Sequence, residues 1–186
     1  MLRSLPFVLA FAGFASAADF KPEPGFAMIF NGKDLTGWQV APTKDKDKEK
    51  AGESLTGKTE TPTKRFTVKD ETLIIDPKVK GDITIFTEKT YAKDAHIQFD
   101  FKFGKDCNND LFFRGMKFDI KEPDIKNLKK DGEWNTFEIV VTGENAEFKC
   151  NGEVVKKMKA KPAATNFGIR AELGAIEYRR IRIKGE

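Results

Sequence analysis

Apolar and polar residues alternate most clearly between positions 96 and 103. Ile97, Phe99, Phe101 and Phe103 alternate with polar residues from His96 onward, which is the period of two of a half-buried strand. Shorter runs rich in β-branched and aromatic residues, separated by turn signals, surround this segment. They lie at 66–68, 73–75, 83–86, 111–114, 118–120, 137–142, 146–150, 153–158, 167–171 and 176–183. About eleven short strands of this kind predict an all-β sandwich or barrel.

Three local signals refine this pattern. Asn151–Gly152 predicts a two-residue hairpin, because both positions of a type I′ turn need positive φ. Lys69–Asp70 predicts a turn between two of the short strands. Strict alternation breaks at Arg179–Arg180 in the last strand, which predicts a bulge. The only helix candidate, at 124–130, is no longer than two turns.

The first residues predict export. Arg3 precedes an apolar run from Leu5 to Phe14, and Ala15–Ala17 supplies the small residues of a cleavage site. This is the pattern of a secretory signal peptide at residues 1–17, with the mature chain beginning near Ala18. No cysteine follows the apolar run, so we expect a secreted or periplasmic protein without a lipid anchor.

Composition narrows the class of protein. Residues 18–186 fit one domain, and no further apolar segment is long enough to cross a membrane. The net charge is +4, but charges of opposite sign interleave, as at 44–50, so a nucleic-acid partner is not expected. Residues 41–64 are mainly Lys, Thr, Glu and Gly with almost nothing to bury, which predicts a charged loop.

Residue counts exclude some chemistry. Beyond the leader the chain has one serine, Ser54, and one histidine, His96. A Ser-His-Asp triad would require the charged loop to fold onto the His96 strand, and a histidine-based metal site lacks ligands. Cys107 and Cys150 could form a disulfide in an oxidising compartment, or they could be two separately buried thiols.

A calcium site is also not expected. Asp106, Asn108 and Asp110 have the spacing of the first three ligands of a calcium loop. The sixth and twelfth positions should then be Gly and Glu, but they are Leu111 and Lys117. We therefore expect neither a metal nor a cofactor.

Two polar rows are candidates for binding a sugar. His96 and Asp100 share the polar side of their strand, which is either a solvated outer side or part of a concave sugar-binding sheet. If Leu111 points into the core, then Phe112 and Arg114 point the other way. Arg114 could form a structural ion pair or donate hydrogen bonds to a sugar or carboxylate.

Carboxylates for glycoside chemistry, which usually needs two that face each other, are available. The candidates are Asp100, Asp110, Asp119 and Glu172. The tryptophans Trp38 and Trp134 fit packing anchors better than ligand platforms.

Five segments together resemble the 3-keto-disaccharide hydrolase domain family, also described as 3-keto-glucoside lyase/hydratase. The segments are Ile29–Trp38, Phe66–Leu73, Asn109–Gly115, Gly132–Ile139 and Glu177–Ile183. The resemblance covers nearly the whole mature chain. It implies a concanavalin-like jelly-roll sandwich of two antiparallel sheets, export, and action on 3-keto sugars.

The resemblance also shapes the expected site. The base would be Asp110, Asp119 or Glu172, with Arg114 or Arg170 as its electrostatic partner. Phe112, Arg114, Arg170, His96 and Asp100 are the candidate substrate-binding residues.

This chain departs from the family pattern in two places. It has Met116–Ile120 where the family reads E-V-Q-I-x-D, and 170–174 lacks the His of L-Q-x-H-G. The alternative function is therefore a non-catalytic glycan-binding or cell-surface module.

Overall fold

The alternating segment forms strand β6 (Ala95–Phe103), and its odd-numbered side chains are all buried, as predicted. β6 lies inside an eight-stranded antiparallel sheet, the larger sheet, with the order β11-β10-β9-β6-β13-β4-β3 and with β1 paired to β13. Its other strands are β1 (Ala27–Met28), β3 (Phe66–Lys69), β4 (Thr72–Ile75), β9 (Asn135–Thr142), β10 (Asn145–Cys150), β11 (Glu153–Lys159) and β13 (Ile176–Gly185).

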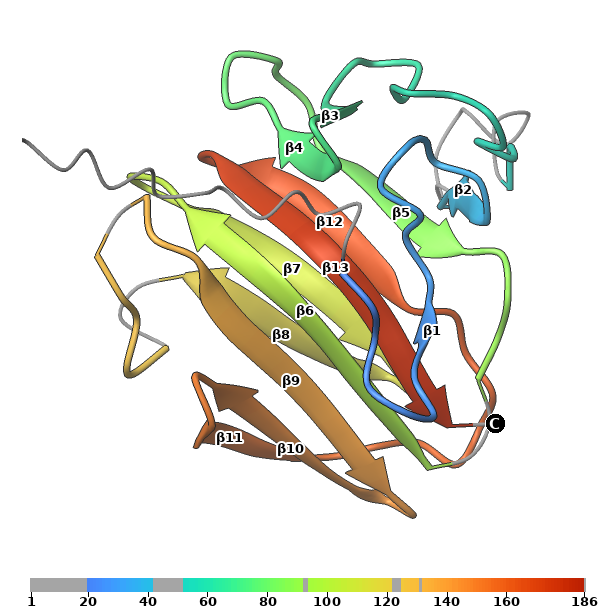
Figure 1. Ribbon diagram of the computed structural model, residues 1–186, viewed down its shortest axis with the longest axis vertical. Coiled ribbons are helices and arrows are strands. Elements are labelled where there is room, and N and C mark those ends of the chain that lie inside the picture. The colour runs from blue at the N-terminus through green and yellow to red at the C-terminus, as the bar shows by residue number, and fades with distance from the viewer. Residues whose placement is uncertain (1–19, 42–51, 92–93, 122–124, 131, 186) are drawn as a thin grey trace, which may run out of the picture.

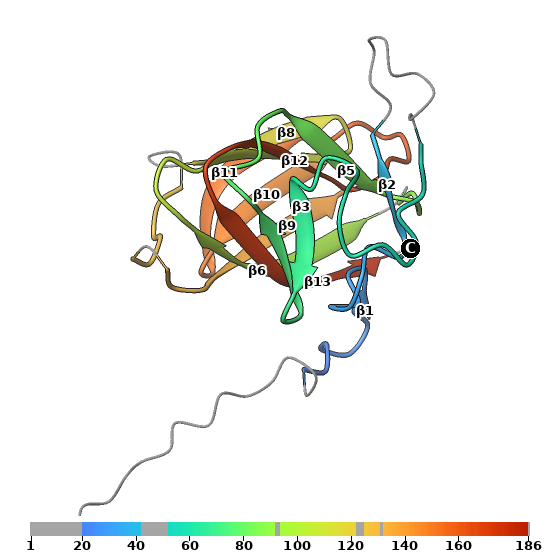
Figure 2. The ribbon, with the colours of Figure 1, turned by 90° about the horizontal axis from the view of Figure 1, so that it is seen from above.

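Five strands form a second antiparallel sheet, the smaller sheet, in the order β2-β5-β12-β7-β8. They are β2 (Trp38–Val40), β5 (Ile83–Thr87), β7 (Asn108–Phe113), β8 (Met116–Lys121) and β12 (Gly168–Leu173). In Figure 1 the strands β7, β8 and β12 form a layer behind β6, β9 and β13, and in the view from above β8 and β12 lie on one side and β6 and β13 on the other (Figure 2). The fold is an all-β, concanavalin-like jelly-roll sandwich, as predicted.

The computed structural model describes residues 20–41, 52–91, 94–121, 125–130 and 132–185. The predicted signal peptide lies outside these ranges. Within them the chain forms no helix, so the candidate at 124–130 is wrong for its described part, residues 125–130. Accordingly, the described residues contain no helix capable of crossing a membrane.

Phenylalanine side chains join the two sheets. Phe137 of β9 stacks on Phe99 of β6, with ring centroids 5.4 Å apart. Phe118 of β8 crosses the sandwich to lie 5.0 Å from Phe137 and 4.7 Å from Phe148 of β10. All four rings are nearly inaccessible to solvent. The core therefore depends on aromatic packing between the sheets, which adds to the area-based gain from burial.

The turns follow the sequence signals with one shift. Asn151 and Gly152 have φ of 50° and 85°, which confirms the predicted hairpin. Arg180 has φ of 55°, and the pairing of β13 with β6 changes register there, which confirms the bulge. The β3–β4 turn is centred on Asp70 and Glu71, one residue later than predicted, because both have positive φ.

The charged segment is better packed than its composition suggests. Leu55 is fully buried and donates its backbone N–H to the Trp38 carbonyl oxygen at 2.8 Å. Thr61 is also buried; its backbone N–H donates to the Phe66 carbonyl oxygen at 3.0 Å, and its hydroxyl accepts a hydrogen bond from the Phe66 N–H at 3.2 Å. Residues 42–51 lie outside the described residues. For 52–64, the expectation of almost nothing to bury is wrong, because Leu55 lies in the core and Thr61 is buried as well.

Both cysteines are buried free thiols. Burial raises the pKa of Cys107 and of Cys150 to about 11, so each thiol is protonated at neutral pH. Of the two alternatives from the sequence, the structure has the separate thiols.

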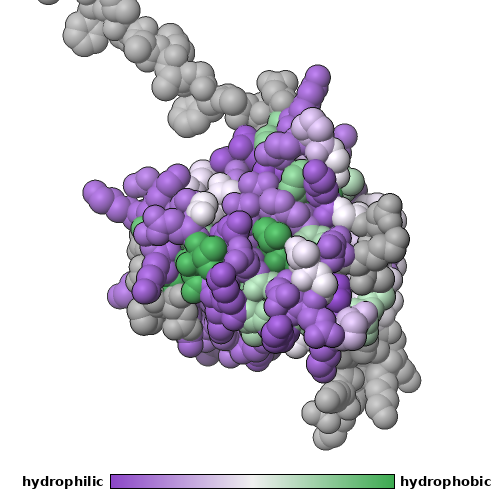
Figure 3. Space-filling view, turned by 90° about the horizontal axis from the view of Figure 1, so that it is seen from below, coloured by the Kyte–Doolittle hydropathy of each residue, from purple (hydrophilic) through white to green (hydrophobic). Residues whose placement is uncertain are grey.

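The described surface is strongly polar, as the interleaved charges predict. Seen from below, it is mostly hydrophilic, with small separated hydrophobic patches (Figure 3). The large apolar side chains exposed among the described residues are Met28, Val154 and Leu173. They are single side chains on different strands.

The segment before β1 is held against β13 by an ion pair. Both carboxylate oxygens of Glu23 accept hydrogen bonds from the Arg182 guanidinium, at 2.8 and 2.9 Å. The Phe20 ring lies 4.6 Å from the Arg180 guanidinium and 5.0 Å from that of Arg182. The hydrogen bonds from Arg182 hold the pKa of Glu23 below its usual value.

We expect Glu23→Gln to loosen this segment without unfolding the domain. The carboxylate is half exposed, so the loss is about 0.4–1 kcal/mol, or roughly a two- to fivefold drop in local amide protection. Because the folded pKa is lowered, the wild type should lose the same protection as pH falls through that pKa. Hydrogen exchange of residues 26–30, corrected for intrinsic rates, measures both effects. Equal protection of wild type and variant at pH 7 would contradict this account.

Candidate functional site

The outer face of the smaller sheet carries a row of polar and aromatic side chains. On β7, Leu111 and Phe113 are buried in the core as predicted, while Phe112 points the other way and is half-buried. Asp110 shares the outer side with Phe112, because side chains alternate along a strand. This face is the candidate site.

Asp110 is at the centre of this face. Its cross-strand neighbours are Asp119 of β8 and Arg170 of β12. The Asp110 carboxylate is fully buried, with Oδ2 3.0 Å from an Arg170 nitrogen and Oδ1 3.2 Å from the Lys117 ammonium. Two cations therefore compensate a charge that would otherwise be costly to bury.

Further carboxylates extend the network on both sides. Lys117 also lies 2.8 Å from Asp119 Oδ1. Arg170 forms a second ion pair with Asp82, just before β5, and approaches Glu172 at 3.6 Å. We call this set the charged cluster: Asp82, Asp110, Lys117, Asp119, Arg170 and Glu172. It combines four carboxylates with two cations.

The environment shifts the pKa values of the two central carboxyl groups, Asp110 and Asp119, in opposite directions. Burial, together with the neighbouring Asp119, raises the pKa of Asp110 against the opposing effect of Lys117. The hydrogen bond from Lys117 lowers the pKa of Asp119, so that group is ionised at neutral pH. In turn Asp119, more than Asp110, raises the pKa of Lys117. A paired acid and base of this kind is typical of sites that transfer protons.

An aromatic pair borders the charged cluster. The rings of Phe86 on β5 and Phe112 on β7 lie 6.2 Å apart, on either side of Gly168 on β12. A Cβ at position 168 would lie 2.3 Å from the Phe86 ring, so the ring needs this glycine. The result is an apolar surface beside charged groups, the combination that binds the faces and hydroxyls of sugars.

The side chains of the charged cluster differ in how far they are exposed to solvent. Asp110 has no exposed side-chain surface, whereas the side chains of Lys117, Asp119 and Glu172 are 46%, 28% and 31% exposed. A ligand on this face would therefore contact these three groups and Arg170, whose side chain is 28% exposed. Asp110 would act on the ligand only through the cations it holds.

The structure brings five of the predicted site residues together. These are Asp110, Phe112, Asp119, Arg170 and Glu172. The other three, Arg114, His96 and Asp100, lie elsewhere.

Arg114 is buried at the turn after β7. Its φ of 49° takes it out of strand geometry, and its Nε donates to the Lys161 carbonyl oxygen at 2.5 Å. Its backbone N–H donates to the Thr165 hydroxyl. The expectation that Arg114 points outward beside Asp110 is wrong, because the strand ends one residue earlier.

His96 lies on the outer face of the larger sheet, on the far side of the core. Its Nε2 is 2.7 Å from Glu138 Oε2, and its ring packs edge-on against Phe26 at 5.0 Å. His96 thus lies half-buried on the outer side of a strand inside the larger sheet, where Glu138 and Phe26 engage it.

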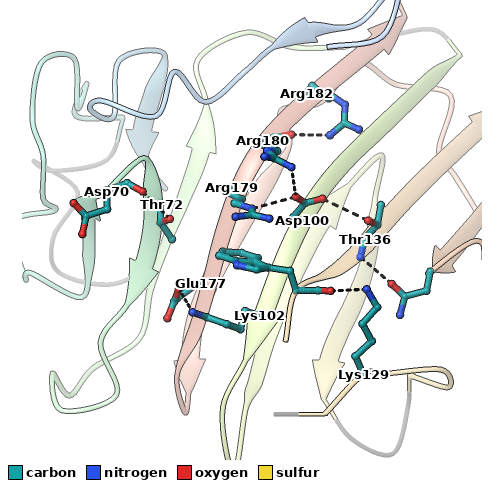
Figure 4. Close-up of polar contacts among 12 residues, drawn as sticks. Asp70, Thr72, Asp100, Lys102, Lys129, Thr136, Glu177, Arg179, Arg180 and Arg182 are labelled. Atoms are coloured by element: carbon teal, nitrogen blue, oxygen red, sulfur yellow. Dashed lines mark hydrogen bonds and ion pairs between the residues drawn. The ribbon is translucent and has the colours of Figure 1, made fainter. Parts of the chain in front are cut away.

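Asp100 shares that outer face and is also engaged. Its Oδ2 accepts hydrogen bonds from Arg179 at 3.1 Å and Arg180 at 3.3 Å (Figure 4). Arg179 in turn covers the Trp134 ring at 3.9 Å, and Lys102 lies 5.0 Å from the same ring. These contacts form a paired surface network across β6 and β13, separate from the charged cluster.

The tryptophans differ in their environments. Trp38 is fully buried and its indole N–H donates to the Ile29 carbonyl oxygen at 2.8 Å, which confirms it as a packing anchor. Trp134 instead lies partly exposed between cations on the larger sheet.

Sequence reasoning missed Lys117, Phe86, Gly168 and Asp82. Lys117 lies one residue before the predicted strand at 118–120 and two residues before Asp119, so extending that strand by one residue would have placed both side chains on one face. Phe86 also lies in a predicted strand, but only the pairing of β5 with β12 places it beside Gly168. Within the described ranges no three His, Cys, Asp or Glu residues form a group able to hold a metal ion.

Solved structures with the same fold include carbohydrate-related proteins. One, described as a "putative glycosyl hydrolase" from Parabacteroides distasonis ATCC 8503, has a TM-score of 0.65 at 17% identity, over 87% of this chain and 94% of the other. The carbohydrate-binding module CBM66 from Bacillus subtilis has a TM-score of 0.50 at 11% identity, over 81% and 97%. The exoplasmic/lumenal domain of VIP36, bound to Ca²⁺ and Man3GlcNAc, gives 0.53 at 7% identity, over 84% and 89%.

These features define the class as a carbohydrate-related jelly-roll domain with a charged and aromatic sheet face. The chain belongs to the 3-keto-alpha-glucoside-1,2-lyase-like domain family, whose model matches residues 25–127 and 116–184. Among curated proteins, none matches this chain in sequence.

Proposed function

We propose that the outer face of the smaller sheet binds a 3-keto-glycoside and cleaves it by elimination next to the ketone. The observation that carries the proposal is the accessible Asp119 carboxylate, 2.8 Å from the Lys117 ammonium and one strand away from the Phe112 ring. An ionised carboxylate can accept the acidic proton beside a ketone. Family membership supplies the substrate class.

The substrate we favour is uncharged. The charged cluster contains four carboxylates and two cations, so it would repel an anionic sugar more than it would attract one. A neutral ring can stack on Phe86 and Phe112 while its hydroxyls meet the polar groups.

The residues take distinct roles in this mechanism. Asp119 removes the proton from the carbon next to the ketone, and the electron pair forms an enolate. The enolate then expels the glycosidic oxygen, which takes the proton back from Asp119. Glu172, 31% exposed at the other end of the cluster, is positioned to bind hydroxyls or to act as a second base. Asp110 is a positioning residue, because it is buried and orients Arg170 and Lys117.

We also propose that the protein acts outside the cytoplasm. The basic start, the apolar run and the small residues at 15–17 support cleavage before Ala18. N-terminal sequencing of the exported protein would test this, and an intact Met1 would contradict it.

Turnover of a 3-keto-glucoside tests the enzymatic proposal. We expect the mature wild type to release the aglycone and Asp119→Asn to lose about 10²–10⁴-fold in kcat, because the amide cannot accept the proton. Lys105→Met, at an exposed turn position before β7 and outside the charged cluster, is the control and should keep wild-type kcat. Full activity of Asp119→Asn would assign the base elsewhere, with Glu172→Gln as the next variant.

A second candidate function is glycan binding without turnover. It is favoured by the completeness of the ion pairing, since Asp110, Lys117 and Arg170 all have charged partners within the face. It predicts saturable binding of a glycan that weakens in Phe112→Ala and in Gly168→Ala, which displaces the Phe86 ring. Unaltered affinity in both variants would exclude this face as the binding surface.

A further inference from the structure

Lys117 stands out among the accessible groups of the candidate site. Its ammonium lies between two carboxylates, 3.2 Å from Asp110 and 2.8 Å from Asp119, yet the side chain is 46% exposed. An ammonium has three N–H donors, so Lys117 can pair with these carboxylates and still donate a hydrogen bond to a ligand. Lys117 also lies directly opposite Phe112 across the β7–β8 pair, so its charge is next to the aromatic surface.

The two neighbouring carboxylates also keep Lys117 protonated. Asp119 and Asp110 both raise its pKa, so the group remains an ammonium at neutral pH. A protonated amine cannot attack a ketone to form an imine. It can donate a hydrogen bond to a ketone oxygen and stabilise negative charge on it.

We propose that Lys117 is the cation that receives the negative charge of the ketone oxygen when the neighbouring proton is removed; this inference rests on the proposed function. In that step the C–H bond breaks and its proton moves to Asp119. The electron pair of the C–H bond forms a carbon–carbon double bond, and the ketone oxygen becomes an enolate oxygen beside Lys117. The base, Asp119, and the cation, Lys117, are in contact. This suits the substrate, because its acidic carbon is bonded directly to the carbonyl carbon.

Arg170 is the less suitable cation. Its guanidinium faces three carboxylates, those of Asp82, Asp110 and Glu172, whereas the Lys117 ammonium faces two and its side chain is more exposed. Its function in the site is to compensate the negative charge of the buried Asp110. The other carboxylate oxygen of Asp110 then holds the Lys117 ammonium in position. The chain thus provides a fixed positive charge from its own side chains at the position where the enolate forms.

The test compares Lys117→Met and Lys117→Gln with Lys105→Met as the control. Two rates are measured: aglycone release from a 3-keto-glucoside, and solvent deuterium exchange at the carbon next to the ketone. We expect both Lys117 variants to lose about 10²–10³-fold in kcat and in exchange, with KM within about threefold of wild type. The control should keep wild-type values. Lys117→Gln keeps a polar side chain with N–H donors beside the aspartates, so it provides a folded comparison if Lys117→Met unfolds.

The experiment distinguishes failure of the proposed role of Lys117 from failure of the proposed function. If the wild type turns over and a folded Lys117→Gln keeps kcat and exchange within about threefold, the role of Lys117 is wrong while the proposed function stands. An increase in KM alone, with kcat unchanged, would also overturn the inference, because it indicates ground-state binding. If the wild type shows neither turnover nor exchange, the proposed function fails and this inference fails with it.

Discussion

Phe137→Ala is expected to lower the free energy of unfolding by about 3–5 kcal/mol. Phe137 is fully buried, and its ring lies between Phe99 of the same sheet and Phe118 of the opposite one, at 5.4 and 5.0 Å. Truncation removes this bridge and leaves a cavity that the surrounding sheets can fill only in part. Urea unfolding followed by far-UV circular dichroism measures the loss.

Phe112→Ala is the matched control for this prediction. Phe112 is also a strand phenylalanine with an aromatic neighbour, but it lies half-buried on the outer face of the smaller sheet. Its truncation opens no enclosed cavity, so it should cost clearly less than that of Phe137. Equal losses for the two variants would contradict the assignment of inner and outer faces on these strands.

Arg170→Met is expected to cost about 3 kcal/mol of stability, at the lower end of the range for breaking a buried ion pair. It removes one of the two cations that compensate the fully buried Asp110 carboxylate and leaves Lys117 alone with that charge. The same urea experiment measures this loss. The loss should grow as pH rises from acid toward neutral, because Asp110 has a raised pKa and its proton relieves the unpaired charge.

A double variant tests the cause of that loss. Asp110→Asn with Arg170→Met removes both charges, so it should be less destabilised than the sum of the single variants, by about 1–3 kcal/mol. Purely additive losses would mean that Arg170 stabilises the sheet through packing of its side chain rather than through Asp110.

Much of the fold followed from short-range patterns in the sequence. The alternation in 96–103 placed Phe99 and Phe101 inside and Asp100 outside, since that choice depends on strand geometry alone. The hairpin at Asn151–Gly152 and the bulge at Arg180 were likewise encoded by local backbone preference. Arg114 could not be placed in this way, because the end of β7 is set by the hydrogen bonds it makes with 161–165.

The candidate site depended on information that single strands do not carry. Asp110, Asp119 and Arg170 were identified individually, but only the lateral order β12-β7-β8 brings them together. His96 and Asp100 lie on β6, which the strand order assigns to the larger sheet, although the alternating pattern of β6 resembles that of β7. Parity along a strand separates inner from outer side chains, but it does not tell which of two outer faces a residue joins.

The most direct test of the central claim is to map ligand contacts on ¹⁵N-labelled mature protein by NMR while a 3-keto-glucoside, or a non-reacting glucoside, is added. We expect saturable shift changes centred on the amides of Phe112, Lys117 and Arg170, on the outer face of the smaller sheet. Shift changes centred instead on His96, Asp100 and Arg179, or none at all with folded protein, would contradict it.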